Sequence, residues 1–89
     1  MFSKDLYIVC VCDPDMRDVK IERFYDADVY DLDTLLAGYR KQLKGLNIQV
    51  SKTNGEGFID VINEDKMLDR TYVIIKKSGF VTKPNAYKD

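Results

Sequence analysis

The two cysteines are the most reactive side chains in the sequence, and they lie two positions apart. Cys10 and Cys12 belong to an apolar run over residues 6–12 that predicts a strand. Two positions along an extended strand separate their Cα atoms by roughly 6.6–7 Å, a poor distance for a disulfide. Two thiolates supply half of a tetrahedral zinc site, and the sequence contains no histidine. We therefore predict that both thiols are reduced, buried and free of metal.

Aspartates cluster near the middle of the chain, at Asp26, Asp28, Asp31 and Asp33. Clustered carboxylates are typical ligands of calcium, but the EF-hand spacing is not met: Asp31 and Ala37 stand where that loop needs Gly and Glu. Turn formation and helix capping account for these aspartates. A second interpretation is an acidic surface that docks on a basic partner, with Asp26 and Asp28 as candidate contacts.

Basic residues gather in two segments. Residues 36–53 contain four bases and no acid, and residues 71–89 contain four bases and one acid. Aromatic residues lie among the later bases, a composition typical of surfaces that bind single-stranded nucleic acid. The candidate contacts are Arg40, Lys41, Lys44, Phe80 and Tyr87. Because the net charge is −1 and lysine outnumbers arginine ten to four, nucleic-acid association is the alternative hypothesis and not the first.

No pattern in the sequence indicates catalysis. The absence of histidine excludes imidazole chemistry within one chain, and no serine has an evident base within reach. The segment Asn54-Gly55-Glu56-Gly57 lacks the lysine and the spacing of a phosphate-binding loop, and a hairpin turn explains it. We therefore expect a protein that is not an enzyme and that uses no cofactor or metal.

A helix over residues 32–44 is the clearest predicted element. Its apolar residues follow the i, i+3, i+4, i+7 spacing of one helical face: Leu32, Leu35, Leu36, Tyr39 and Leu43. Asp31 is suited to cap its start, and Gly45 to end it. Strands are predicted over residues 6–12, 19–25, 47–53 and 71–77, with another around Ile59 and Val61. Residues 63–70 are either a helical turn or a loop, and a turn at Ser78-Gly79 precedes a short strand over residues 80–82.

These elements predict an α+β fold, with a small, mostly antiparallel sheet in β-β-α-β-β-β order and one main amphipathic helix packed on one face. Residues 1–82 form a single domain, and residues 83–89 form a polar C-terminal tail. If Asn54-Gly55 is a two-residue turn, Val50 pairs with Ile59. A four-residue loop would pair Val50 with Val61 instead.

The predicted sheet has more apolar surface than one helix covers. The first and last strands are apolar on both faces, so the uncovered face carries either Tyr7, Val9 and Val11 or the residues that point the other way. Residues 80–89 are expected to cover this face in part. We predict that a second copy or another protein covers the rest, with Val9 and Ile74 as candidate contacts at mid-strand.

The sequence thus favours a small non-enzymatic protein-interaction domain of the accessory, adaptor or inhibitor type. Such a domain self-associates or docks on a larger protein through its apolar sheet face and its charged loops. Small proteins of this kind are often encoded in operons or phages. No apolar run approaches the roughly 20 residues of a membrane span, and residues 1–5 do not resemble the start of a signal peptide, so the cytoplasm is the expected location.

The helical pattern generates a test of its phase. Leu36 lies at the centre of the apolar stripe, so Leu36→Ala should lower the free energy of unfolding by about 2–5 kcal/mol. Lys41→Ala, on the opposite side of the helix, should change it little. Chemical denaturation of both variants measures the difference, and the reverse ranking would show that the helical phase is wrong.

Overall fold

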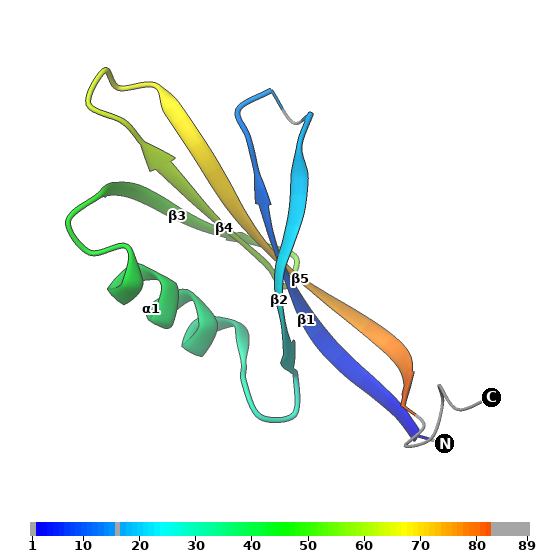
Figure 1. Cartoon of the computed structure of the whole chain (residues 1–89). Coiled ribbons are helices and arrows are strands. Elements are labelled where there is room, and N and C mark those ends of the chain that lie inside the picture. The colour runs from blue at the N-terminus through cyan, green and yellow to red at the C-terminus, as the bar shows by residue number, and fades with distance from the viewer. Residues whose placement is uncertain (1, 16, 83–89) are drawn as a thin grey trace.

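The computed structural model of the protein describes residues 2–15 and 17–82, with side chains described for residues 4–15 and 17–79. Five strands and one helix make up this part of the chain (Figure 1). In chain order they are β1 (Phe2–Cys12), β2 (Val19–Asp26), α1 (Leu32–Gln42), β3 (Asn47–Thr53), β4 (Glu56–Ile62) and β5 (Leu68–Thr82).

The strands form one antiparallel sheet in the order β2-β1-β5-β4-β3. The two edge strands, β2 and β3, are joined through α1, so the chain crosses from one edge of the sheet to the other over a single face (Figure 1). The prediction of an α+β fold with a small antiparallel sheet and one main helix is confirmed at this level.

Local interactions fix both ends of α1. The Asp31 side chain accepts a hydrogen bond of 2.7 Å from the backbone N–H of Thr34, which satisfies one of the free donors in the first turn. This bond to the charged carboxylate lowers the pKa of Asp31. Arg40 lies in the last turn, where a cation is favoured, and Gly45 reverses the chain with a φ of +94°.

The core lies between α1 and the sheet. Leu35, Leu36 and Tyr39 are buried on the helical side, and three residues of the sheet have no exposed surface, namely Val9, Ile59 and Ile74. Gly57 of β4 also faces the helix, and a Cβ atom there would lie 3.0 Å from methyl groups of Leu32 and Leu36. The glycine therefore lets α1 approach the sheet closely.

The β3–β4 hairpin has the register of a two-residue turn. Asn54 and Gly55 both adopt positive φ, 52° and 79°, as a turn of type I′ requires. Val50 consequently pairs with Ile59, the first of the two registers predicted from the sequence.

The segment after β4 is a loop and not a helix. The Asn63 side chain accepts hydrogen bonds from the backbone N–H groups of Asp65 and Met67, and Lys66 adopts a φ of 64°. These local bonds compete with helix formation and turn the chain into β5. Of the two alternatives that the sequence allows for residues 63–70, a helical turn or a loop, the structure has the loop.

The predicted turn at Ser78-Gly79 is wrong. β5 continues through it to Thr82, because the sheet register shifts between Lys4 and Leu6 and so accommodates two residues of β5 opposite one of β1. Gly79 takes the positive φ of this bulge, 79°. β1 likewise starts at Phe2 and not at Leu6, and the two strands project beyond the helix as a two-stranded ribbon (Figure 1). The predicted tail over residues 83–89 lies outside the described residues.

Two glycines facing different surroundings test the packing of α1. Gly57→Val adds methyl groups against Leu32 and Leu36, and overpacking of this kind costs about 1–3 kcal/mol. Gly38 lies within α1 and has nothing within 4 Å of its Cβ position, so Gly38→Ala should raise the free energy of unfolding by about 0.5–1 kcal/mol. Urea denaturation checks both signs. A stabilising Gly57→Val would contradict the close approach of the helix.

Candidate functional site

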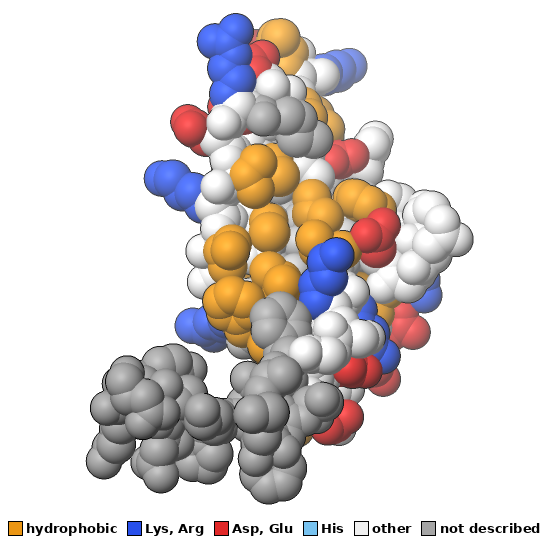
Figure 2. Space-filling model, turned by 90° about the vertical axis from the view of Figure 1, so that its right-hand side faces the viewer, with side chains coloured by type: hydrophobic (Ala, Val, Ile, Leu, Met, Phe, Trp, Pro, Cys, Tyr) orange, Lys and Arg blue, Asp and Glu red, His pale blue; other side chains and the backbone are white. Residues whose placement is uncertain are grey.

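The sheet face that points away from α1, called the open face below, is apolar at its centre. Figure 2 shows hydrophobic side chains gathered there, with charged side chains mostly at the margins. Strand alternation and the pairing register identify the residues on this face. The apolar residues among them are Leu6, Ile8, Cys10 and Cys12 of β1, Val19, Ile21 and Phe24 of β2, Phe58 and Ile62 of β4, and Leu68, Val73 and Ile75 of β5.

The open face is most exposed along β2. Val19, Ile21 and Phe24 have 56%, 59% and 51% of their surface exposed. The residues of the central strands, such as Ile8 and Val73, are half-buried by their neighbours within the sheet. A continuous apolar surface of this kind across four strands is typical of an interaction site.

The open face also carries charged residues, and two of them are paired with each other. Lys4 and Asp26 form an ion pair of 2.8 Å, and their hydrogen bond raises the pKa of Lys4 and lowers the pKa of Asp26. Asp60 accepts a hydrogen bond of 2.8 Å from the hydroxyl of Thr71, which is buried, but this neutral donor leaves the negative charge of Asp60 in place. The register also places Lys77 on this face, beside Leu6. The side chains that β3 adds to this face, those of Asn47, Gln49, Ser51 and Thr53, are neutral.

The cysteines differ in burial. Alternation places both thiols on the open face, but Cys12, which pairs with Val19 and Thr71, is buried, as predicted, whereas Cys10 is only half-buried. Partial burial, with a smaller effect of the neighbouring thiol, raises the pKa of Cys10. The prediction that both thiols are buried is therefore wrong for Cys10, which contributes a neutral, apolar group to the open face.

Val9 and Ile74 do not lie on the open face. Both have no exposed surface beneath α1, so neither can contact a partner in this fold. The sequence left open which side of the first strand the helix covers, and the helix covers the side of Tyr7, Val9 and Val11. The Phe80 side chain and Tyr87 lie outside the described residues.

The aspartates around the start of α1 have structural partners. Asp26 accepts a hydrogen bond from the backbone N–H of Asp28 and also forms the ion pair with Lys4. Asp31 caps the helix. Asp33 pairs with Lys52 at 2.8 Å. In residues 2–15 and 17–82, no three metal-ligating side chains lie close enough to hold an ion. Asp28 remains exposed in the turn that follows β2.

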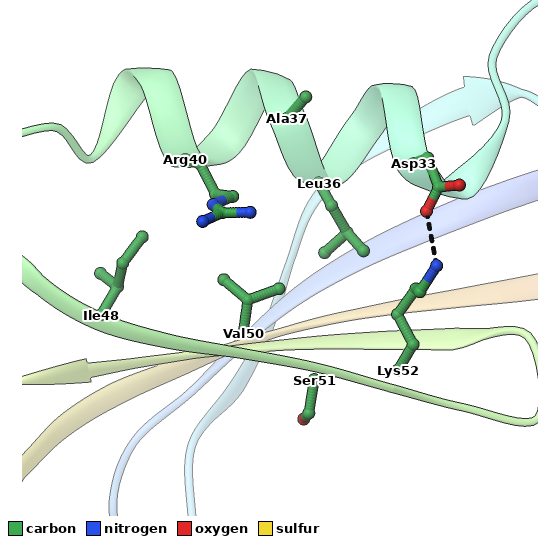
Figure 3. Close-up of a pocket in the computed structure, with 8 residues that line it drawn as sticks. All are labelled: Asp33, Leu36, Ala37, Arg40, Ile48, Val50, Ser51 and Lys52. Carbon is green, nitrogen blue, oxygen red and sulfur yellow. Dashed lines mark hydrogen bonds and ion pairs between the residues drawn. The ribbon is translucent and has the colours of Figure 1, made fainter.

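The predicted basic contacts separate into different surfaces. Arg40 points from α1 toward β3, where it lines a groove with Ile48 and Val50 (Figure 3). Lys41 and Lys44 are exposed on the helix and do not line this groove. These three bases therefore do not form one continuous track of the kind that follows a nucleic-acid backbone.

Three polar side chains meet beside the core. The Tyr39 hydroxyl donates a hydrogen bond of 2.7 Å to the Glu22 carboxylate and lies 3.3 Å from the Tyr25 hydroxyl. Burial, together with these two neighbours, raises the pKa of Tyr39. The hydroxyl therefore stays protonated and links α1 to β2, a structural role that requires no ligand.

Comparisons with known proteins do not identify a relative: no family model matches the chain, and neither does a curated protein or a solved structure. In the part of the chain that the structure describes, α1 is the longest helix at 11 residues, and no helix is long and apolar enough to cross a membrane. Among the surfaces described, the open face has the most exposed apolar side chains and is the main candidate for a functional surface.

The exposure of the two thiols predicts their reactivity. An alkylating reagent should modify Cys10 before Cys12 in the folded protein at low protein concentration, because Cys12 is only 6% exposed. Since the pKa of Cys10 is raised from 9.0, its thiolate forms only at higher pH, and its rate of alkylation should still be rising above pH 9. Peptide mass spectrometry over a pH series measures both effects. Faster modification of Cys12 would contradict the placement of the two side chains.

Proposed function

We propose that the protein is a non-enzymatic interaction domain whose open face packs against the open face of a second copy. The observation that carries the proposal is the row of exposed apolar side chains on β2, among them Ile21 and Phe24, continuous with the half-buried centre of the sheet. Two sheets with apolar faces pack about 10 Å apart, with their strands nearly aligned. When two copies pack in this way, each buries the open-face apolar side chains of the other, which a single copy leaves exposed.

The size of the open face suits a dimer. Five strands about 4.8 Å apart and seven residues of about 3.3 Å each span roughly 24 Å by 23 Å, or about 550 Å² in projection. Side-chain relief makes the accessible area larger than the projected area. Stable interfaces bury about 800 Å² on each partner, and crystal-packing contacts about half of that or less.

The charge distribution favours a second copy over a foreign partner. An interface with two-fold symmetry brings the same groups of both copies together, so an unbalanced charge would repel itself. The ion pair of Lys4 with Asp26 and the neutral side chains of β3 avoid this repulsion. Docking on a larger protein or on nucleic acid has no comparable support, because acids such as Asp60 and bases such as Lys77 are both present on this face, so neither sign dominates it.

Phe24 provides the test. With 51% of its surface exposed, it can carry a charge without disturbing the core, so Phe24→Glu should leave the circular dichroism spectrum unchanged. In the dimer the same charge is buried and unpaired. The dissociation constant of the dimer, measured by sedimentation equilibrium, should rise at least about 30-fold, the effect of losing an interface hot spot.

A matched control is Val29→Glu. Val29 is 70% exposed and lies in the loop after β2, away from the open face, so its substitution should leave the dimer intact. The wild type should also remain dimeric at high salt, because apolar contacts are not screened. A wild type that stays monomeric at millimolar concentration, or a Phe24→Glu variant that dimerises normally, would refute the proposal.

A further inference from the structure

The two edges of the sheet differ in how well they are protected. β2 carries four charged residues, Lys20, Glu22, Arg23 and Asp26, and a bulge interrupts its pairing where Glu22 is inserted. Charges and bulges are the devices that keep other strands from pairing with an edge. β3 has one charged residue, Lys52, and its pairing with β4 is regular along its whole length. The outer edge of β3 is therefore open to another strand.

The backbone of β3 presents its free groups at regular positions. In a two-residue hairpin the residues that flank the turn bond to each other, so Thr53 and every second residue before it bond to β4. Ile48, Val50 and Lys52 then direct their N–H and C=O groups outward. Their side chains point to the helical side of the sheet, so the same three residues offer both backbone bonds and side-chain contacts.

A groove of about 620 Å³ runs between β3 and α1. Figure 3 shows Ile48 and Val50 pointing up into it from the strand and Leu36 pointing down from the helix, whereas Ser51 points away. Side chains on the helical side of an added strand would enter this groove. The exposed sheet edge and this partly apolar groove together have the form used to bind extended peptides by strand addition.

The charges of the groove select the peptide. Lys52 is neutralised at one end by Asp33, at 2.8 Å. Arg40 extends from α1 toward the part of the strand between Ile48 and Val50, and it forms no ion pair within the described residues. The groove therefore has an unbalanced positive charge at the Arg40 end, and a guanidinium recognises a carboxylate well.

We infer that the groove between α1 and β3 binds an extended acidic peptide segment as a sixth, antiparallel strand. In this orientation an apolar side chain lies opposite Val50, and an acidic side chain two positions later lies opposite Ile48, beside Arg40. A second copy of β3 is a poor occupant of this edge. Pairing about its midpoint, Val50, would place the Lys52 of one copy, already paired with Asp33, opposite Ile48 of the other, so Arg40 would gain no free carboxylate partner.

This site is separate from the proposed dimer interface. The peptide bonds to the outer edge of β3 and places its selective side chains on the helical side of the sheet, whereas two copies meet through the open face. Binding can therefore be measured in the monomeric Phe24→Glu variant as well as in the wild type, and failure of one proposal does not imply failure of the other.

The test uses two capped nine-residue peptides of β-forming residues, with Val-x-Glu or Val-x-Lys at the centre, and fluorescence anisotropy. The wild type should bind the Glu peptide about tenfold more tightly than the Lys peptide, as expected for one charge-assisted pair. Arg40→Glu should reverse the preference. Lys41→Glu makes the same charge change on the neighbouring, exposed residue outside the groove and should preserve the preference.

Amide hydrogen exchange locates the bound peptide. Addition of the Glu peptide should slow exchange at Ile48, Val50 and Lys52, whose N–H groups point outward, and leave the amides of β2 unchanged. The inference is overturned if neither peptide binds, if Arg40→Glu does not reverse the preference, or if protection appears on β2. It is also overturned if the three β3 amides become protected with rising protein concentration alone, because that result identifies a second copy as the occupant.

Discussion

The packing of one helix on one face of a five-stranded sheet is the constraint on which the other features depend. α1 joins the two edge strands, so its path across the sheet fixes which face is covered. Gly57 allows the helix to approach β4 closely, and Val9, Ile59 and Ile74 are sealed beneath it. The opposite face of the same central strands receives no cover from the helix, and its apolar side chains stay in contact with water.

This constraint links stability to interaction. The residues that hold the monomer together and those that the proposed dimer buries alternate along the same strands, as Val9 and Ile8 do on β1. A single strand thus serves the core with one set of side chains and the surface with the other. Stability and association can consequently be altered separately, by substitutions on opposite faces of one strand.

The helix also shapes the edge of the sheet. α1 lies over β3 but does not pack against the whole strand. A groove therefore remains between them, and Arg40 projects into it. The ion pair of Asp33 with Lys52 closes one end of this groove and leaves the charge of Arg40 uncompensated. The molecule therefore offers two surfaces of different character: the open face, with its apolar centre, and a groove beside a free strand edge, with an arginine that is unpaired within the described residues.

Local sequence patterns are enough to predict two elements: the helix with Asp31 as its cap, and the hairpin at Asn54-Gly55. The sequence also shows that the sheet is apolar on both faces. The face that α1 covers depends on packing between distant segments, because both alternating sets of side chains in β1 are equally apolar. The prediction that Val9 contacts a partner is wrong for this reason, since Val9 is buried. The bulges at Glu22 and Gly79 likewise depend on pairing between distant strands, which no local pattern encodes. They place Phe24 on the open face and carry β5 past its expected end.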